Sequence, residues 1–124
     1  MQYLAIGLAG FLGAISRHAV GVLVKNVTGT SEIPWATLFV NTSGSFLIGF
    51  LLALAGGRLP VHPELRTIIV IGFVGSYTTF SAFSFETLDL LARGNWPVAF
   101  VNAFGGVLVG LLAVYLGLVV GRLA

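Results

Sequence analysis

The residues most able to do chemistry gather in one uncharged stretch, Thr67 to Phe85. From Gly72 it reads Gly72-Phe-Val-Gly75-Ser-Tyr-Thr78-Thr79-Phe80-Ser81-Ala-Phe83-Ser-Phe85, and Glu86 follows directly. The stretch is long enough to span a bilayer as a helix, but its glycines and hydroxyls suit a lipid-facing helix poorly. Gly75-Ser76 should loosen the helix, and the hydroxyls of Thr78 and Thr79 can bond backbone groups that a break frees. Such breaks line cavities and often hold ions, so the sequence predicts a third span broken mid-membrane at the functional centre.

Two phenylalanines follow this predicted break. Phe80 and Phe83 lie three residues apart and share one helical face, while Ser81 and Ser84 alternate with them. An aromatic ring has an electropositive edge, so edges turned inward can touch an anion without holding it tightly. Fast conduction needs several such weak sites, with hydroxyl donors beside them. Ordinary packing is the alternative interpretation, and it is favoured for any isolated phenylalanine.

A polar stripe runs along the second hydrophobic segment. Thr37, Asn41 and Ser45 are spaced four residues apart and so share a helical face. The Asn41 amide carries two donors and two acceptor sites, which need partners in an apolar setting. The stripe therefore predicts either a hydrogen bond that joins helices or a donor that faces a pore.

The few charged residues near these segments form no catalytic set. Arg17 inside the first span costs roughly 2.5–3.5 kcal/mol, unless its side chain reaches the interface. It lies there either for structural reasons or as a cation near an anion entrance. Glu86 can pair with a basic group or cap the broken helix. No paired catalytic carboxylates, nucleophile–base set or phosphate loop is present, so we expect a protein that is not an enzyme.

Composition identifies the class of protein. Of the 124 residues, 57% are hydrophobic and 8% are charged, and the mean hydropathy is +1.04. Soluble domains carry about 25% charged residues, so the chain is expected to be an all-α integral membrane protein. Without a basic run, nucleic acid is not an expected partner. The absence of cysteine excludes disulfides and thiolate metal sites.

Four transmembrane spans fit the hydrophobic pattern, and together they form a single domain over residues 1–124. The spans are expected at about 4–24, 35–55, 67–92 and 97–121. With four spans, the six basic residues divide three against three between the two sides: Arg58, Arg66 and Arg122 against Arg17, Lys25 and Arg93. The positive-inside rule then selects neither orientation. Either the tie is chance, or the protein inserts both ways and pairs as an antiparallel, dual-topology homodimer.

Small residues recur at helical spacing in the second and fourth spans. The ladders are Asn41, Ser45, Gly49, Ala53 and Gly57, and the pairs Gly106/Gly110 and Gly117/Gly121. Such faces let helix backbones approach closely in lipid. They fit packing within one subunit and a dimer face equally well.

Three motifs resemble the Fluc (CrcB) family of fluoride channels, in order and in spacing. They are Gly10-x-x-Gly13-Ala14-x-x-Arg17, Thr37-Leu38-x-Val40-Asn41-x-x-Gly44-Ser45-Phe46-Leu47-x-Gly49, and Gly72-Phe-x-Gly75-x-x-Thr78-Thr79-Phe80-Ser81-x-Phe83-x-x-Glu86. The resemblance covers essentially the whole chain. The combination of Thr-Thr-Phe-Ser-x-Phe with the Asn41 motif is highly specific, whereas GxxxG pairs alone carry no weight.

The resemblance implies a passive, fluoride-selective channel in the prokaryotic plasma (inner) membrane, which lets fluoride leave the cytoplasm and so reduces its toxicity. It implies an antiparallel homodimer with two pores, in which the edges of Phe80 and Phe83 meet fluoride and Asn41 donates nearby. It also places Arg17 near the aqueous vestibule. From the residues themselves, Thr79 and Ser81 are expected as further donors in the pore and Glu86 as support for the broken helix. A structural sodium ion at the dimer centre would be held by the main-chain carbonyls of Gly75 and Thr78.

Two features depart from the family pattern. Ser76-Tyr77 stands where many members have a small residue followed by an aliphatic one. In the fourth span, Gly106 and Gly110 stand where relatives have pore-lining hydroxyls. The polar track there would then depend on Asn102, Thr79, Ser81 or water.

Two other functions compete with the channel. Proton-coupled small multidrug exporters also have four spans and dual topology, but they depend on an acid in the first span, which here holds Arg17 and no acid. A non-transporting membrane scaffold subunit would explain the small-residue faces but not the motif around Phe80.

Overall fold

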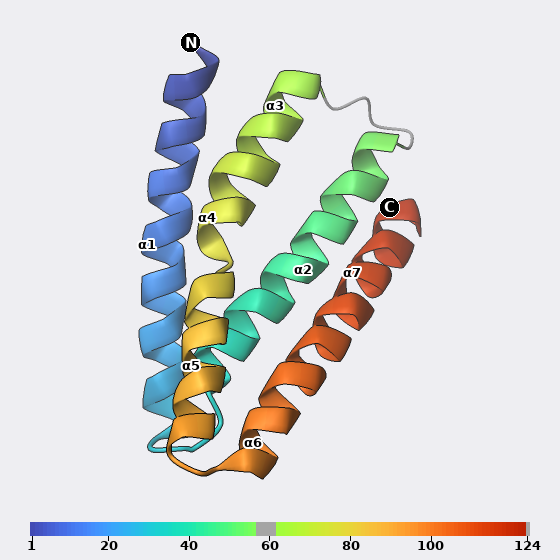
Figure 1. Ribbon diagram of the computed structural model, residues 1–124. Coiled ribbons are helices and arrows are strands. Elements are labelled where there is room, and N and C mark those ends of the chain that lie inside the picture. The colour runs from blue at the N-terminus through green and yellow to red at the C-terminus, as the bar shows by residue number, and fades with distance from the viewer. Residues whose placement is uncertain (57–61, 124) are drawn as a thin grey trace.

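Helices make up nearly all of the chain, and the computed structural model describes residues 1–56 and 62–123. Four long helical segments run side by side, and both termini lie at the same end (Figure 1). In chain order the elements are α1 (Gln2–Thr28), α2 (Trp35–Gly56), α3 (Pro63–Thr67), η1 (Ile68–Val74), α4 (Gly75–Tyr77), α5 (Phe80–Ala92), α6 (Trp96–Phe100), η2 (Val101–Gly105) and α7 (Gly106–Leu123). The third segment comprises α3 to α5, and the fourth comprises α6 to α7.

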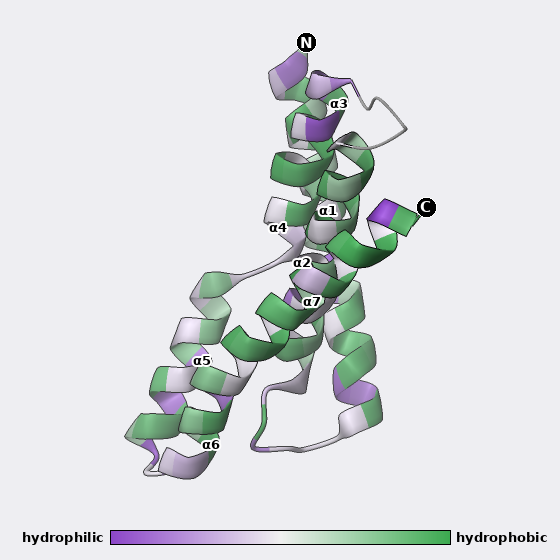
Figure 2. Cartoon of the chain, turned by 90° about the vertical axis from the view of Figure 1, so that its right-hand side faces the viewer, coloured by the Kyte–Doolittle hydropathy of each residue, from purple (hydrophilic) through white to green (hydrophobic). Residues whose placement is uncertain are grey.

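Each long segment is apolar enough to cross a membrane. The four candidate spans are Gln2–Thr28, Trp35–Gly56, Pro63–Ala92 and Trp96–Leu123. Hydrophobic residues dominate all of them (Figure 2). The prediction of an all-helical protein with four spans is confirmed, and the helices extend a few residues beyond most of the predicted limits.

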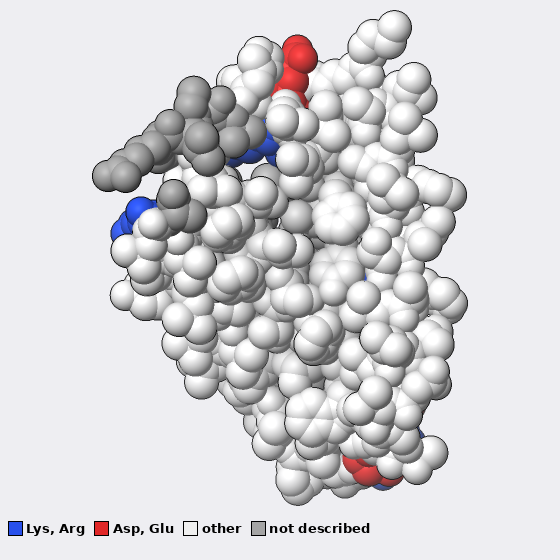
Figure 3. Space-filling view, turned by 180° about the vertical axis from the view of Figure 1, so that it is seen from behind, with Lys and Arg blue, Asp and Glu red and all other residues white. Residues whose placement is uncertain are grey.

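Most charged side chains lie toward the two ends of the molecule, whereas Arg17 and Glu86 lie within the spans. The face drawn in Figure 3 is almost uncharged between its ends. Lys25 and Arg93 lie toward the end that carries the α1–α2 loop, and Arg66 and Arg122 lie toward the end that carries the termini. Arg58, which the predicted tie also counts, lies outside the described residues. The charge pattern fits an uncharged band between two aqueous faces.

Helices α2 and α7 pack backbone against backbone. A Cβ atom added at Gly49 of α2 would overlap the Val114 carbonyl of α7, and one added at Gly117 would overlap the Phe46 carbonyl of α2. A Cβ at Gly121 would lie 2.6 Å from the Phe50 carbonyl oxygen. These glycines therefore pack helices within one subunit. Gly57, the last member of the predicted ladder, lies outside the described residues.

Gly117→Ala should destabilise the protein, because the two helix backbones would have to separate. Overpacking of this kind costs about 1–3 kcal/mol. Thermal unfolding in detergent measures the change. Gly7→Ala is the matched control, since a Cβ at Gly7 meets no atom within 4 Å and alanine favours the helix. Equal melting temperatures for the two variants would contradict the α2–α7 packing.

The third segment is not one continuous α-helix. It begins with a short α-helix and a π-helical stretch, and α4 ends at Tyr77. Thr78 (φ −78°, ψ 160°) and Thr79 (φ −149°, ψ 112°) are extended, and α5 begins at Phe80. Gly75, which was expected to loosen the helix together with Ser76, is helical (φ −63°, ψ −31°). The irregular residues are therefore the two threonines rather than Gly75-Ser76.

Beyond the extended residues, α5 runs away from α1 (Figure 2). The η1 helix, by contrast, packs tightly on α1, where a Cβ at Gly13 would overlap the Phe73 carbonyl. At Gly72 a Cβ would lie 2.8 Å from the Ile6 carbonyl oxygen. The change in direction opens space between α5 and the last turns of α1.

Candidate functional site

Asn41 bonds the extended backbone between α4 and α5. Its Nδ2 donates to the Thr79 carbonyl at 3.0 Å, and its Oδ1 accepts from the Thr79 N–H at 2.8 Å. The amide thus pairs with both backbone groups of one residue, as a neighbouring strand would. An amide nitrogen carries two hydrogens, and among the described residues Nδ2 donates only to Thr79, so its second N–H can donate to a ligand. Both interpretations of this residue are therefore compatible: it joins helices and can also act as a donor.

Asn41 shares a groove of about 280 Å³ with both phenylalanines. The ring centroids of Phe80 and Phe83 lie 6.0 Å apart, with their planes tilted by 37°. Phe80 is 78% exposed in the single chain. The groove runs between α2, α5 and α7 and is lined by Leu38, Asn41, Ser45, Phe80, Phe83, Gly106, Val107, Gly110, Leu111 and Val114. The spacing of the motifs thus brings Asn41, Phe80 and Phe83 to one place.

Two glycines of α7 form the opposite wall of this groove. A Cβ at Gly106 would lie 3.0 Å from Cε2 of Phe83, and a Cβ at Gly110 would lie 3.7 Å from Oγ of Ser45. Gly106 therefore gives the Phe83 ring its space. At Gly110 the nearest hydroxyl comes from α2 rather than from the fourth span.

Gly106→Ala should displace the Phe83 ring and change transport through the groove. A contact of 3.0 Å is closer than packed carbon atoms allow, so the ring must rotate or shift. The matched control is Gly105→Ala, because a Cβ at Gly105 meets only Val101 Cγ1, at an ordinary 3.9 Å. Ion efflux from reconstituted vesicles compares the two variants. Equal rates would show that the position of Phe83 does not limit transport.

A second, larger cavity of about 640 Å³ lies between the last turns of α1, the start of α2 and the start of α5. Arg17, Lys25 and Glu86 line it, together with Thr79 and Ser81. The Thr79 and Ser81 hydroxyls lie 3.3 Å apart, and Thr79 caps α5 by accepting the Ala82 N–H at 3.3 Å. We call this cavity the vestibule. The residues predicted to meet the anion or support its path thus divide between the groove and the vestibule, and Thr79 connects the two through its bonds to Asn41.

Glu86 lies in the second turn of α5 and is held by α2. Its Oε1 accepts the Thr37 hydroxyl at 2.7 Å. The other oxygen, Oε2, is buried and has no partner among the described residues. The hydroxyl that caps α5 belongs to Thr79 rather than to Glu86, which instead accepts a hydrogen bond from Thr37 of α2.

Asn102 is 5% exposed and lies outside both the groove and the vestibule. Its Nδ2 donates to the Thr87 hydroxyl at 2.9 Å, and that hydroxyl donates to the Phe83 carbonyl at 2.8 Å. These bonds join η2 to α5, the helix that carries Phe83. Asn102 therefore supports the groove indirectly.

The extended residues free main-chain carbonyls. In a continuous helix the Thr79 N–H would bond to the Gly75 carbonyl, but here it donates to Asn41. The Thr78 carbonyl accepts a long bond of 3.4 Å from the Arg17 guanidinium. Both oxygens therefore retain the capacity to bind another group.

Comparison with known proteins assigns the family. The model of the family described as CrcB-like protein, Camphor Resistance (CrcB), matches residues 4–118. The chain belongs to the CrcB family. The resemblance seen in the three sequence motifs is thereby confirmed.

Similar CrcB-family proteins come from several bacteria and bear the name Fluoride-specific ion channel FluC. One from Magnetococcus marinus is 44% identical over 123 residues, which cover 99% of each chain. One from Acidobacterium capsulatum is 40% identical over 98% of this chain and 97% of the relative. One from Methylobacterium radiotolerans is 44% identical over 91% of this chain and 79% of the relative. Four apolar helices and this family make the chain a multi-pass prokaryotic membrane protein of a transporter class.

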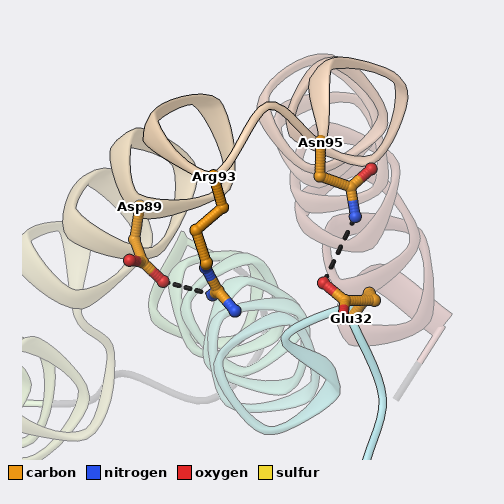
Figure 4. Close-up of polar contacts among 4 residues, drawn as sticks. All are labelled: Glu32, Asp89, Arg93 and Asn95. Atoms are coloured by element: carbon orange, nitrogen blue, oxygen red, sulfur yellow. Dashed lines mark hydrogen bonds and ion pairs between the residues drawn. The ribbon is translucent and has the colours of Figure 1, made fainter.

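At the end of this CrcB-family protein that carries the α1–α2 loop, Figure 4 shows two polar contacts. Arg93 pairs with Asp89 one turn earlier in α5. Asn95, in the α5–α6 turn, donates to Glu32 of the α1–α2 loop at 3.2 Å. The second contact joins loops that are far apart in the sequence.

Sequence reasoning missed two contributors to the site. Lys25 lines the vestibule beside Arg17 and Glu86, but a lone lysine at a span end gives no signal of its own. Tyr77 was noted only as a departure from the family pattern. Its hydroxyl lies 2.9 Å from the Ser43 hydroxyl of α2, and the polar character of both residues was the available signal.

Proposed function

We propose that the chain is a passive, fluoride-selective ion channel that lets fluoride leave the cytoplasm and so reduces fluoride toxicity. The observation that carries this proposal is the 44% identity, over 99% of both chains, to a protein named a fluoride-specific ion channel. The groove agrees with it, because an amide donor and two aromatic rings converge there. The exporter alternative is not favoured, since α1 contains no Asp or Glu. A scaffold would not need the Asn41–Thr79 bonds.

The residues suggest the path of the anion. The basic side chains of Arg17 and Lys25 attract it into the vestibule. The hydroxyls of Thr79 and Ser81 replace part of its hydration shell. The free N–H of Asn41 and the ring edges of Phe80 and Phe83 then hold it weakly, as rapid conduction requires.

The working unit is an antiparallel, dual-topology homodimer. The Phe80 ring is 78% exposed in the single chain, and a ring edge that contacts an anion must be shielded from lipid. A second copy would supply that shield. A tag at the C-terminus, probed from both sides of the membrane, should be found equally on each side. One-sided exposure would contradict the dual topology.

The main-chain carbonyls of Gly75 and Thr78 are proposed to hold a structural sodium ion at the dimer centre. Two observations support this site. The Thr79 N–H, the usual helical partner of the Gly75 carbonyl, donates to Asn41 instead. The Thr78 carbonyl accepts a long bond from Arg17. A hard cation prefers such oxygen ligands. When bound, the ion would supply a fixed positive charge beside the extended residues. Replacing sodium by N-methyl-D-glucamine should lower the melting temperature, and an unchanged melting temperature in all cations would refute the site.

Passive anion efflux tests the channel itself. Purified protein is reconstituted into sealed vesicles loaded with fluoride or with chloride, without a proton gradient. Rapid release of fluoride, with chloride retained, is the expected result. Retention of fluoride by vesicles that contain folded, dimeric protein would overturn the proposal.

A further inference from the structure

A tyrosine beside the extended residues bonds a serine of α2. The Oη of Tyr77 lies 2.9 Å from the Oγ of Ser43. Tyr77 is 6% exposed, and its ring stacks on Phe73 with centroids 6.0 Å apart and planes 5° apart. Its side chain therefore has a single well-packed position at the end of α4.

The direction of this hydrogen bond follows from the other contacts of Ser43. The Ser43 hydroxyl carries one hydrogen, and its oxygen lies 2.8 Å from the Phe39 carbonyl oxygen and 3.1 Å from the Val40 carbonyl oxygen. Carbonyl oxygens only accept, so Ser43 donates its hydrogen to these carbonyls and its oxygen accepts the Tyr77 hydroxyl. The phenol is thereby bonded, through Ser43, to the backbone of α2.

Three residues of α2 contact three consecutive residues around the change in direction. Ser43 bonds Tyr77, and Asn41 bonds the backbone of Thr79. Thr78 lies between Tyr77 and Thr79, and it packs against Gly44. A Cβ added at Gly44 would overlap the threonine methyl group. Helix α2 therefore contacts and positions each residue from Tyr77 to Thr79, immediately before Phe80.

We propose that Ser43 and Tyr77 are a positioning pair that sets the direction in which the chain leaves α4. The Asn41 amide holds the far side of the extended residues, and the phenol–serine bond holds the near side. Together they determine where Phe80 enters the groove. This inference rests on the proposed channel function, in which the position of Phe80 matters for the rate.

Tyr77→Phe tests the pair, because it removes the hydroxyl and keeps the stacked ring. Fluoride efflux per folded dimer should fall about fivefold, as expected for one lost hydrogen bond. Ser43→Ala should have a similar effect, and Ser43→Thr, which keeps a hydroxyl, should restore most of the rate. The double variant Tyr77→Phe/Ser43→Ala should lose no more than either single variant, since both remove the same bond.

Tyr115→Phe is the matched control, because Tyr115 lies on α7 and is 64% exposed. Its rate should equal that of the unmodified protein. Additive losses in the double variant, or a lower melting temperature with an unchanged rate per folded dimer, would overturn the pair as a positioning device. Failure of the proposed channel function is distinguishable, because the unmodified protein would then release no fluoride.

Discussion

Replacing Phe80 and Phe83 by isoleucine is expected to abolish fluoride efflux while the protein stays folded and paired. Isoleucine preserves apolar bulk but has no electropositive edge. If the ring edges stabilise the anion at the barrier to conduction, losing about 1.5 kcal/mol of contact lowers the rate roughly tenfold, so each single substitution should have an effect of that size. The measurement is fluoride efflux from vesicles containing equal amounts of folded dimer.

The control for this prediction is Phe104→Ile. Phe104 stacks on Phe100, with ring centroids 5.7 Å apart, and does not line the groove. Phe104→Ile should lower the melting temperature through lost packing, but it should not lower fluoride efflux per folded dimer. If Phe80→Ile and Phe83→Ile conducted at the same rate as Phe104→Ile, the rings would be packing residues, and the path of the anion would lie elsewhere.

The hydrophobic pattern of the sequence predicted much of this architecture, because a segment that crosses lipid must be a long apolar helix. Four apolar segments predict four spanning helices, and the model has them. The stripe of Thr37, Asn41 and Ser45 predicts one polar face, and the structure gives all three a place at the site. Thr37 bonds Glu86, Asn41 bonds Thr79, and Ser45 lines the groove.

Other features depend on competition between helices, which local sequence does not report. Gly75-Ser76 has the lower helix propensity, yet the chain becomes extended at Thr78-Thr79, where Asn41 offers the backbone an alternative partner. The glycine ladders have the same ambiguity. Their spacing fits contact within or between subunits, and only the α2–α7 packing assigns Gly49 and Gly117 to the first.

Asn41→Asp is expected to have the largest effect of a single substitution. The carboxylate can still accept the Thr79 N–H, but it cannot donate to the Thr79 carbonyl, and an unsatisfied buried group costs about 1–3 kcal/mol. The new negative charge also faces the groove that Asn41 lines. At 4 Å and an effective dielectric constant of 20, repulsion of an anion is about 4 kcal/mol, so efflux should fall more than about a hundredfold.

Comparison with Asn41→Ala separates the two causes, because alanine removes the hydrogen bonds without adding a charge. Its efflux should fall less than that of Asn41→Asp, while its loss of stability should be similar. Asn102→Ala removes a buried amide outside the groove; it should lower the melting temperature through the lost bond to Thr87, and it should lower efflux less than Asn41→Ala does. Were Asn41→Asp and Asn41→Ala to conduct equally, the amide would act only on the backbone of Thr79. The anion would then meet the phenylalanine rings without help from α2.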